Sequence, residues 1–213
     1  MLLEILLITS INTGEANPDR KEVSASGRDP DYLGRHAMKS IIDCLLIWWL
    51  RTGRYSWSLL RRRLCESKYL STVLPTVDSL EEIEAFLKQL KWTMDGLLHL
   101  YDCISYPQVT WDKEKDDCDS FASLAAELLH RWKPGCNPVL VTVVVRPVRA
   151  SHTVCIVTVP EDNLCFFDSD SLQCDSYQKY DEVVAKISEH AQRLVCWDVR
   201  NPVTLEMIEF LKV

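Results

Sequence analysis

The chain has 213 residues, of which 47% are hydrophobic and 26% charged. That is enough for a real core in one large domain, or in one domain with an appendage. The net charge of −7 argues against sequence-independent binding of nucleic acid, which needs a basic surface.

The N-terminal residues MLLEILLITS are apolar but form a short run. Glu4 stands where a secretory signal peptide carries positive charge, and no clear small-residue cleavage site follows. The apolar run over residues 41–50 contains Asp43 and is too short to span a bilayer. We therefore expect a cytoplasmic protein without a membrane span. Residues 12–37 are polar, with Pro, Gly and Ser scattered through them, which is typical of a linker or a surface arm.

Four helices are expected before residue 133. The third has an apolar stripe with steps of three and four residues, with Asp78 as its N-cap and Glu81 as the partner in a capping box. The fourth begins at Cys118 and is stopped by Pro134 and Gly135. The expected helical ranges are 38–51, ended near Gly53, then 57–70, 80–101 and 119–132, and a loop holding Pro107 and Trp111 precedes the fourth.

Strands dominate the rest of the chain. The segment 139–146 is β-branched and mostly apolar, and a turn at residues 160–162 separates two further apolar runs. The expected elements are strands over 139–146, 152–159 and 163–168, a helix over 177–193, a strand over 194–199 and a closing element over 204–212. Helices that precede strands predict an α+β fold with a largely antiparallel sheet. We expect residues 1–75 to form an N-terminal arm and helical extension, and residues 76–213 to form the main domain.

The nine cysteines include no CxxC pair, which leaves a zinc ribbon or a thioredoxin-type motif without support. Their odd number excludes complete pairing within the chain, and a chain of this length needs no disulfides to fold. Most are therefore expected to be buried thiols in a reducing compartment. Cys155 and Cys165, inside apolar strands, fit that description.

One cysteine stands out because a His and an Asp follow it on two successive strands. Cys118 begins a helix, His152 begins a strand and Asp168 ends the next strand. Thiol chemistry needs a base within hydrogen-bond reach of the sulfur and a third group that orients the imidazole. The helix dipole and a neighbouring imidazolium both favour the thiolate. We therefore predict a nucleophile, base and orienting acid, with Asp170 as the alternative acid.

The surroundings of Cys118 contain opposing influences. Asp116, Asp117 and Asp119 disfavour ionisation of a nearby thiol, although acids also stabilise the start of a helix. An oxyanion would need preorganised donors, for which the backbone N–H of Cys118 is one candidate. Two residues of the preceding loop, Gln108 and Trp111, are candidates for a second donor or a wall of the site.

The segments DDCDSFA, HTVCIV and NLCFFDSD resemble the transglutaminase-like superfamily, and within it the bacterial transglutaminase-like cysteine peptidases. In that family a Gly-Asp-Cys-Glu-Asp type of helix start is followed by a His that begins a strand and an Asp that ends the next. The spacings here are 34 residues from Cys118 to His152 and 16 from His152 to Asp168. The resemblance covers about residues 100–170 and implies a transglutaminase-like or papain-like core.

This sequence departs from the family pattern beside the cysteine. Asp116 stands where the family has Gly, and Ser120 replaces an acid. Some relatives bind calcium through acids beside the nucleophile, and the resemblance implies Asp117 and Asp119 as the ligands here, since hard cations need several oxygen ligands. No cofactor is otherwise expected.

The leading hypothesis is a thiol hydrolase or acyltransferase that acts on peptide or isopeptide bonds of a protein substrate through Cys118, His152 and Asp168. One alternative is a catalytically inactive module of the same fold in a larger assembly, such as a phage particle, with residues 1–75 contacting a protein partner. Another is a metal site that uses Cys118, His152 and nearby cysteines.

Overall fold

The structure, a computed structural model, describes residues 41, 44–69, 71–93 and 103–212. The chain divides into residues 1–38 and 39–213 as two compact units, and the described residues all belong to the second. The predictions for residues 1–37 lie outside the described residues. The described helical elements are η2 (Trp49–Gly53), α2 (Arg54–Tyr69), α3 (Leu80–Leu87), α4 (Pro107–Lys113), α5 (Cys118–Trp132), η3 (Val148–Ala150), η4 (Pro160–Asp162) and α6 (Tyr180–Ile187).

The centre of the fold is a six-stranded sheet in the order β6-β5-β4-β3-β7-β8, in which every neighbouring pair is antiparallel. A separate pair of two-residue strands, β1 and β2, is parallel. The α+β class and the antiparallel sheet are therefore confirmed. The strands are β1 (Lys91–Trp92), β2 (Lys115–Asp116), β3 (Val139–Arg146), β4 (His152–Thr158), β5 (Leu164–Asp168), β6 (Ser171–Tyr177), β7 (Arg193–Arg200) and β8 (Met207–Lys212).

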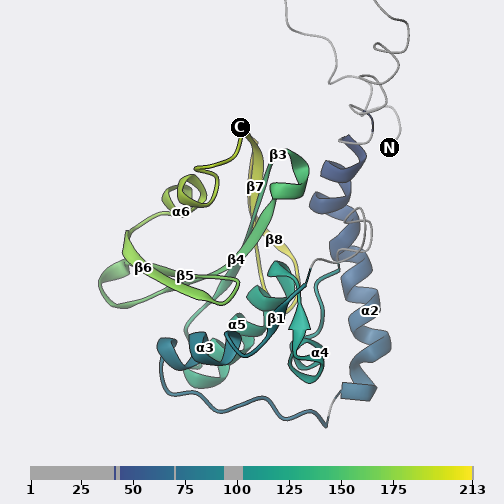
Figure 1. The fold of residues 1–213 in the computed structure, drawn as a ribbon, viewed down its shortest axis with the longest axis vertical. Coiled ribbons are helices and arrows are strands. Elements are labelled where there is room, and N and C mark those ends of the chain that lie inside the picture. Colours follow the sequence, from purple (N-terminus) through teal and green to yellow (C-terminus); the bar gives the residue numbers. More distant parts are fainter. Residues whose placement is uncertain (1–40, 42–43, 70, 94–102, 213) are drawn as a thin grey trace, which may run out of the picture. The chain divides into compact units, whose positions relative to one another are not determined.

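Both faces of the sheet are covered, which explains why its inner strands are nearly continuous runs of apolar residues. Successive side chains of a strand point to opposite faces. In β4, Cys155 and Val157 belong to the core shared with α3 and α5, whereas Val154 and Ile156 belong to the core shared with α6. Figure 1 shows α5 and α6 on opposite sides of the strands. The cysteine-led helix is thus packed on the larger core face, as its apolar stripe predicts.

The sequence predicted that the first helix ends near Gly53. In the structure the helix continues beyond this residue. The π-helical segment η2 carries the chain through Gly53 into α2 without a break. Glycine is required there because a Cβ at this position would lie 2.4 Å from Cε3 of the Trp49 ring. The glycine therefore permits close packing of an aromatic ring instead of stopping the helix.

One side of this long helix is buried. Arg54, Tyr55, Ser58 and Arg62 of α2 are each at most 8% exposed, and Tyr55 lies in the same core cluster as α5. Ser58 accepts a hydrogen bond from the backbone N–H of Ile104 at 2.9 Å. The expected N-terminal helical region is present, and it packs against the core. The division of the chain into an extension over residues 1–75 and a main domain over residues 76–213 stays a prediction.

The helix expected over 80–101 is shorter than predicted. It ends at Leu87, and its N-cap is Ser79 and not Asp78, because the Ser79 side chain accepts from the Glu82 N–H. After a turn the chain enters β1, where Lys91 N–H donates to Glu114 O at 2.8 Å. Backbone pairing with β2 thus overrides the continued apolar spacing. Residues 94–102 lie outside the described part of the chain.

Two further segments differ from their predicted secondary structure. The segment around Pro107, expected as a loop, is helix α4, with Pro107 in its first turn, where proline is tolerated. The helix expected over 177–193 is preceded by an unpredicted strand, β6, and spans only Tyr180–Ile187. Strand β3 has the predicted bounds, and β4, β5 and β7 lie within one residue of theirs.

Candidate active site

Cys118 is the first residue of α5, as predicted. The preceding residue, Asp117, is the N-cap and has an extended backbone conformation. The first N–H groups of a helix have no acceptor within the helix, and the helix dipole places partial positive charge at this end. Cys118 is partly exposed. Its side chain therefore lies at the positive end of the helix dipole, where a reactant can approach it.

His152 and Asp168 are in direct contact. The Nε2 atom of His152 lies 2.6 Å from Oδ1 of Asp168, with the two side chains 23% and 39% exposed. Strands β4 and β5 are antiparallel neighbours, so the start of β4 lies beside the end of β5. With Nε2 engaged by the carboxylate, Nδ1 is the ring nitrogen left to exchange a proton with another group. Asp168 therefore fixes the orientation of the ring.

The electrostatics of His152 connect it to Cys118 as well. Burial of the ring is the largest single influence and lowers its pKa, but it is outweighed by hydrogen bonds to Asp168 and Cys118 and by their negative charges. Together these raise the pKa of His152 to about 10. The same contact with His152 lowers the pKa of Asp168. The three predicted residues thus lie within one interacting group, in which the His152 ring contacts both Asp168 and Cys118.

The group opens into a cavity of about 290 Å³. Cys118, His152 and Asp168 all line it, together with the half-exposed ring of Trp92 and the side chain of Arg149. Neither Trp92 nor Arg149 was predicted as a site residue, because neither lies in a motif. The other lining residues are Leu50, Arg54, Asp117, Thr142, Val148, Ala150, Ser151, Thr153 and Ile187. A space of this size can admit a side chain or a short stretch of peptide.

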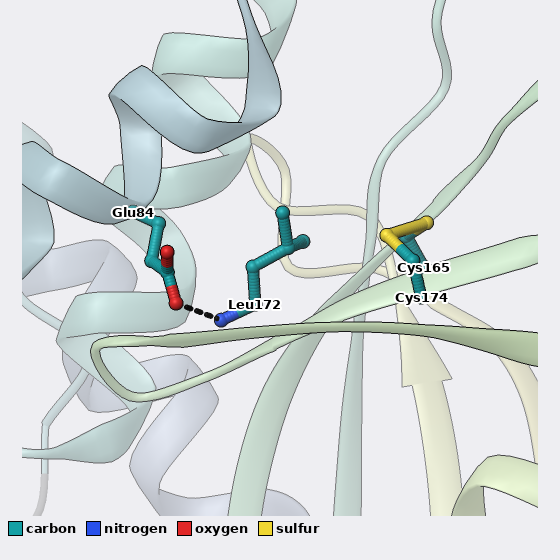
Figure 2. The surroundings of a disulfide bond; sticks show 4 residues. All are labelled: Glu84, Cys165, Leu172 and Cys174. Carbon is teal, nitrogen blue, oxygen red and sulfur yellow. Dashed lines mark hydrogen bonds between the residues drawn. A yellow bond between two sulfur atoms is a disulfide. The ribbon is translucent and has the colours of Figure 1, made fainter.

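The hairpin of β5 and β6, which carries Asp168 at its turn, is fastened at two points. Cys165 of β5 and Cys174 of β6 form a disulfide, and the carboxylate of Glu84 in α3 accepts the backbone N–H of Leu172 at 3.0 Å. Figure 2 shows Glu84 reaching Leu172 from the helix while the disulfide joins the two strands. The expectation that Cys165 is a buried thiol is therefore wrong, because β6, the strand that carries its partner, was not predicted.

A variant with both Cys165 and Cys174 replaced by Ala is expected to lose about 2–3 kcal/mol of unfolding free energy, since the crosslink restricts the unfolded chain. Urea unfolding of the oxidised wild type and the variant measures the difference. A phosphine reductant should lower the stability of the wild type and leave the variant unchanged. Equal sensitivity of the two proteins to the reductant would show that this crosslink is absent in solution.

Two of the acids beside Cys118 are held by specific partners. Oδ2 of Asp119 lies 3.1 Å from Nη1 of Arg54, in an ion pair whose side chains are 2% exposed or less. Asp116 accepts a hydrogen bond from the hydroxyl of Thr110 at 2.9 Å and another from the backbone N–H of Asp117 at 3.2 Å. The cation that offsets the charge of Asp119 comes from α2. Arg54 was not predicted as a site residue, because nothing in the local pattern distinguishes it from the arginines near it.

The other predicted site residues lie elsewhere. Asp170 is exposed in the turn after β5, and the contact with His152 is made by Asp168. Gln108 is buried in α4 and lines a different cavity, of about 560 Å³. Trp111 packs edge-on against Phe86, with ring centroids 5.7 Å apart. Neither Gln108 nor Trp111 lines the cavity that contains Cys118, so these positions give no support to the predicted wall or second donor.

The described residues contain no cluster of three or more His, Cys, Asp or Glu side chains arranged to hold a metal ion. Of the two predicted calcium ligands, Asp117 lines the cavity, whereas Asp119 is engaged by Arg54. Calcium binding stays a prediction.

No protein-family model matches the chain, and no curated protein is detectably similar to it. Among the helices that the structure describes, none combines the length and the apolar character needed to cross a bilayer.

Proposed function

We propose that the protein is a thiol hydrolase or acyltransferase that acts on amide bonds of peptide or isopeptide type. The observation that carries the proposal is the placement of Cys118, His152 and Asp168 around one cavity, with His152 Nε2 2.6 Å from Asp168 Oδ1 and the same imidazole hydrogen-bonded to Cys118. Nucleophile, base and orienting carboxylate in this order form the arrangement that thiol catalysis needs.

In the proposed reaction His152 is protonated at neutral pH, since its pKa is raised to about 10, and the nucleophile is the thiolate form of Cys118, which a neighbouring imidazolium favours. The sulfur of Cys118 attacks the amide carbonyl carbon, and the oxygen becomes an oxyanion. The backbone N–H of Cys118, at the free end of α5, is positioned to donate to that oxygen. Collapse of the adduct expels the amine, which takes its proton from His152, and a thioester to Cys118 remains.

The second half resolves the thioester. The neutral His152 removes a proton from water or from an incoming amine, and the nucleophile attacks the thioester carbonyl. Collapse releases the thiolate of Cys118, with His152 again protonated and Asp168 beside it throughout. Water gives hydrolysis of a peptide or deamidation of a side chain, and a lysine amine gives a crosslink. The fold that we propose for this chemistry is a transglutaminase-like or papain-like core, which the order and spacing of the three residues support.

Cys118 is expected to react with limiting iodoacetamide at pH 7 at least about tenfold faster than Cys44, an exposed cysteine in the same chain. Peptide mass spectrometry resolves the two sites within one sample, so Cys44 serves as the internal reference. Replacing His152 with Ala should remove the advantage of Cys118, because the imidazolium that stabilises the thiolate is lost.

Two outcomes decide between enzyme and inactive module. Fast labelling of Cys118 that depends on His152 supports the proposal, and electrophilic amide and thioester probes then distinguish hydrolysis from transfer to an amine. Labelling of Cys118 no faster than that of Cys44, with no effect of His152→Ala, contradicts the proposal. The fold would then serve the alternative role of a structural or interaction component.

A further inference from the structure

The guanidinium of Arg54 lies between the helix that begins with Cys118 and the strand that begins with His152. Its Nη1 donates to Asp119 Oδ2 at 3.1 Å, and its Nη2 donates to Thr153 Oγ1 at 3.3 Å. Asp119 directly follows Cys118 in α5, and Thr153 directly follows His152 in β4. A single side chain from α2 therefore contacts the neighbours of both the nucleophile and the base.

The same guanidinium is also bound to the sheet and to its own helix. Nη2 donates to Thr142 Oγ1 at 2.8 Å and to the Tyr55 hydroxyl at 2.9 Å. The hydroxyls of Thr142 and Thr153, on the paired strands β3 and β4, are 3.1 Å apart. A planar guanidinium presents its N–H groups in fixed directions, so it can bridge a helix and a sheet. The compact ammonium of a lysine cannot reproduce that geometry.

Charge gives Arg54 a second effect on the sulfur. Asp119 places a carboxylate one residue from Cys118, and negative charge nearby disfavours a thiolate. Both members of the ion pair are almost fully buried, where charges interact more strongly than in water. The cation of Arg54 therefore offsets the acid that would otherwise oppose ionisation of Cys118.

We propose that Arg54 is a positioning residue of the active site, which aligns the start of α5 with the start of β4 and offsets the charge of Asp119. The inference rests on the thiol chemistry proposed above. It makes α2 part of the reactive site, although that region was predicted only as a helical extension.

Arg62, eight residues further along α2, provides a matched control. It is also buried, at 8% exposure, and it makes comparable hydrogen bonds, to Ser105 O at 3.0 Å and to Ser123 Oγ at 2.8 Å. Arg62 lines the separate cavity of about 560 Å³ and not the one that contains Cys118. Asp119 also interacts with the Arg62 guanidinium through its charge, but Arg62 makes no ion pair with it like the 3.1 Å contact of Arg54, so loss of Arg62 should affect the sulfur less than loss of Arg54.

The experiment compares wild type with Arg54→Met, Arg54→Lys and Arg62→Met in the full chain. For each protein, alkylation of Cys118 by iodoacetamide is followed from pH 5 to 10 relative to Cys44, and urea unfolding is measured in parallel. Arg54→Met is expected to slow Cys118 alkylation about tenfold at pH 7 and to move the midpoint of its pH profile upward by about one unit, since one unit corresponds to a tenfold change in the population of thiolate. Arg54→Lys, which keeps the charge, should give an intermediate shift. Arg62→Met should shift the profile clearly less than Arg54→Met, because its charge acts on Asp119 without a direct ion pair.

A wild-type pH profile in both Arg54 variants, or the same shift in Arg62→Met, overturns the positioning role and leaves Arg54 as a structural residue only. If Arg54→Met does not fold, Arg54→Lys decides: an upward shift of its profile supports the proposal, and a wild-type profile overturns it. Failure of the thiol chemistry itself is recognised separately, because wild-type Cys118 would then react no faster than Cys44.

Discussion

Replacing Asp168 with Asn is expected to slow alkylation of Cys118 at pH 7 by about tenfold or more. The carboxylate lies 2.6 Å from Nε2 of His152, and its contact is the largest of the influences that raise the pKa of that ring. An amide is nearly the same size but has no charge, so the imidazolium and the thiolate paired with it both become less stable. Each unit of pKa that is lost reduces the ion-pair population about tenfold.

The same substitution changes the dependence of stability on pH in a defined direction. The pKa of His152 in the folded protein is raised from 6.5 to about 10. Its contribution to the free energy of unfolding is therefore fully present below about pH 6.5 and is lost as pH rises through 10. The folded pKa of Asp168 is lowered from 3.8, so its contribution is present above about pH 4 and is lost as pH falls further. The wild type should therefore exceed Asp168→Asn in stability most between about pH 4 and 6.5.

Urea unfolding at pH 3, 5.5, 7 and 10 tests this prediction. Asp170→Asn is the matched control, because Asp170 is exposed in the adjoining turn and should change neither the alkylation rate nor the stability profile. A constant stability difference across the four pH values, or an equal effect of Asp170→Asn, would contradict the prediction. The contact between Asp168 and His152 would then not be the source of the pH-dependent stability.

The parts of the fold that were predicted correctly are those whose local pattern agrees with their tertiary surroundings. Strand β3 is a β-branched run buried on both faces, so composition alone predicted both of its ends. Helix α5 has a regular apolar stripe and ends before Pro134 and Gly135, which cannot extend it. The start of α5, the start of β4 and the end of β5 were predicted from such local patterns. Cys118, His152 and Asp168 were therefore correctly placed at the ends of these elements.

The parts that were missed depend on contacts between distant residues. Strand β6 is mostly polar and has no fully buried residue, and its pairing with β5 comes from the hairpin, the disulfide and the contact with Glu84. Helix α3 ends early because β1 pairs with β2, although the apolar spacing continues beyond it. Arg54 has partners 65, 88 and 99 residues away. No local pattern predicts interactions over such separations.

Replacing Asp119 with Ala is expected to lower the unfolding free energy by about 3–5 kcal/mol. The substitution removes the carboxylate that lies 3.1 Å from Nη1 of Arg54, in a pair whose side chains are 2% exposed or less. Removing one partner of a buried ion pair costs more than the pair itself contributes, because the remaining charge stays out of water. Urea unfolding at pH 7 measures the loss, and Asp112→Ala, at an exposed position of α4, is the control that should change stability little.

The double variant Arg54→Met, Asp119→Leu separates the energy of the pair from its effect on the site. Apolar side chains of similar volume often replace a buried ion pair with little loss, so the double variant should be more stable than Asp119→Ala. Its Cys118 should nevertheless react more slowly than in wild type, because the bridge from α2 to α5 and β4 is gone while the fold is kept. Recovery of both stability and reactivity would instead mean that packing alone aligns Cys118 with His152. A double variant no more stable than Asp119→Ala would show that the hydrogen bonds of Arg54 to Thr142 and Thr153, and not its charge pair, stabilise this part of the core.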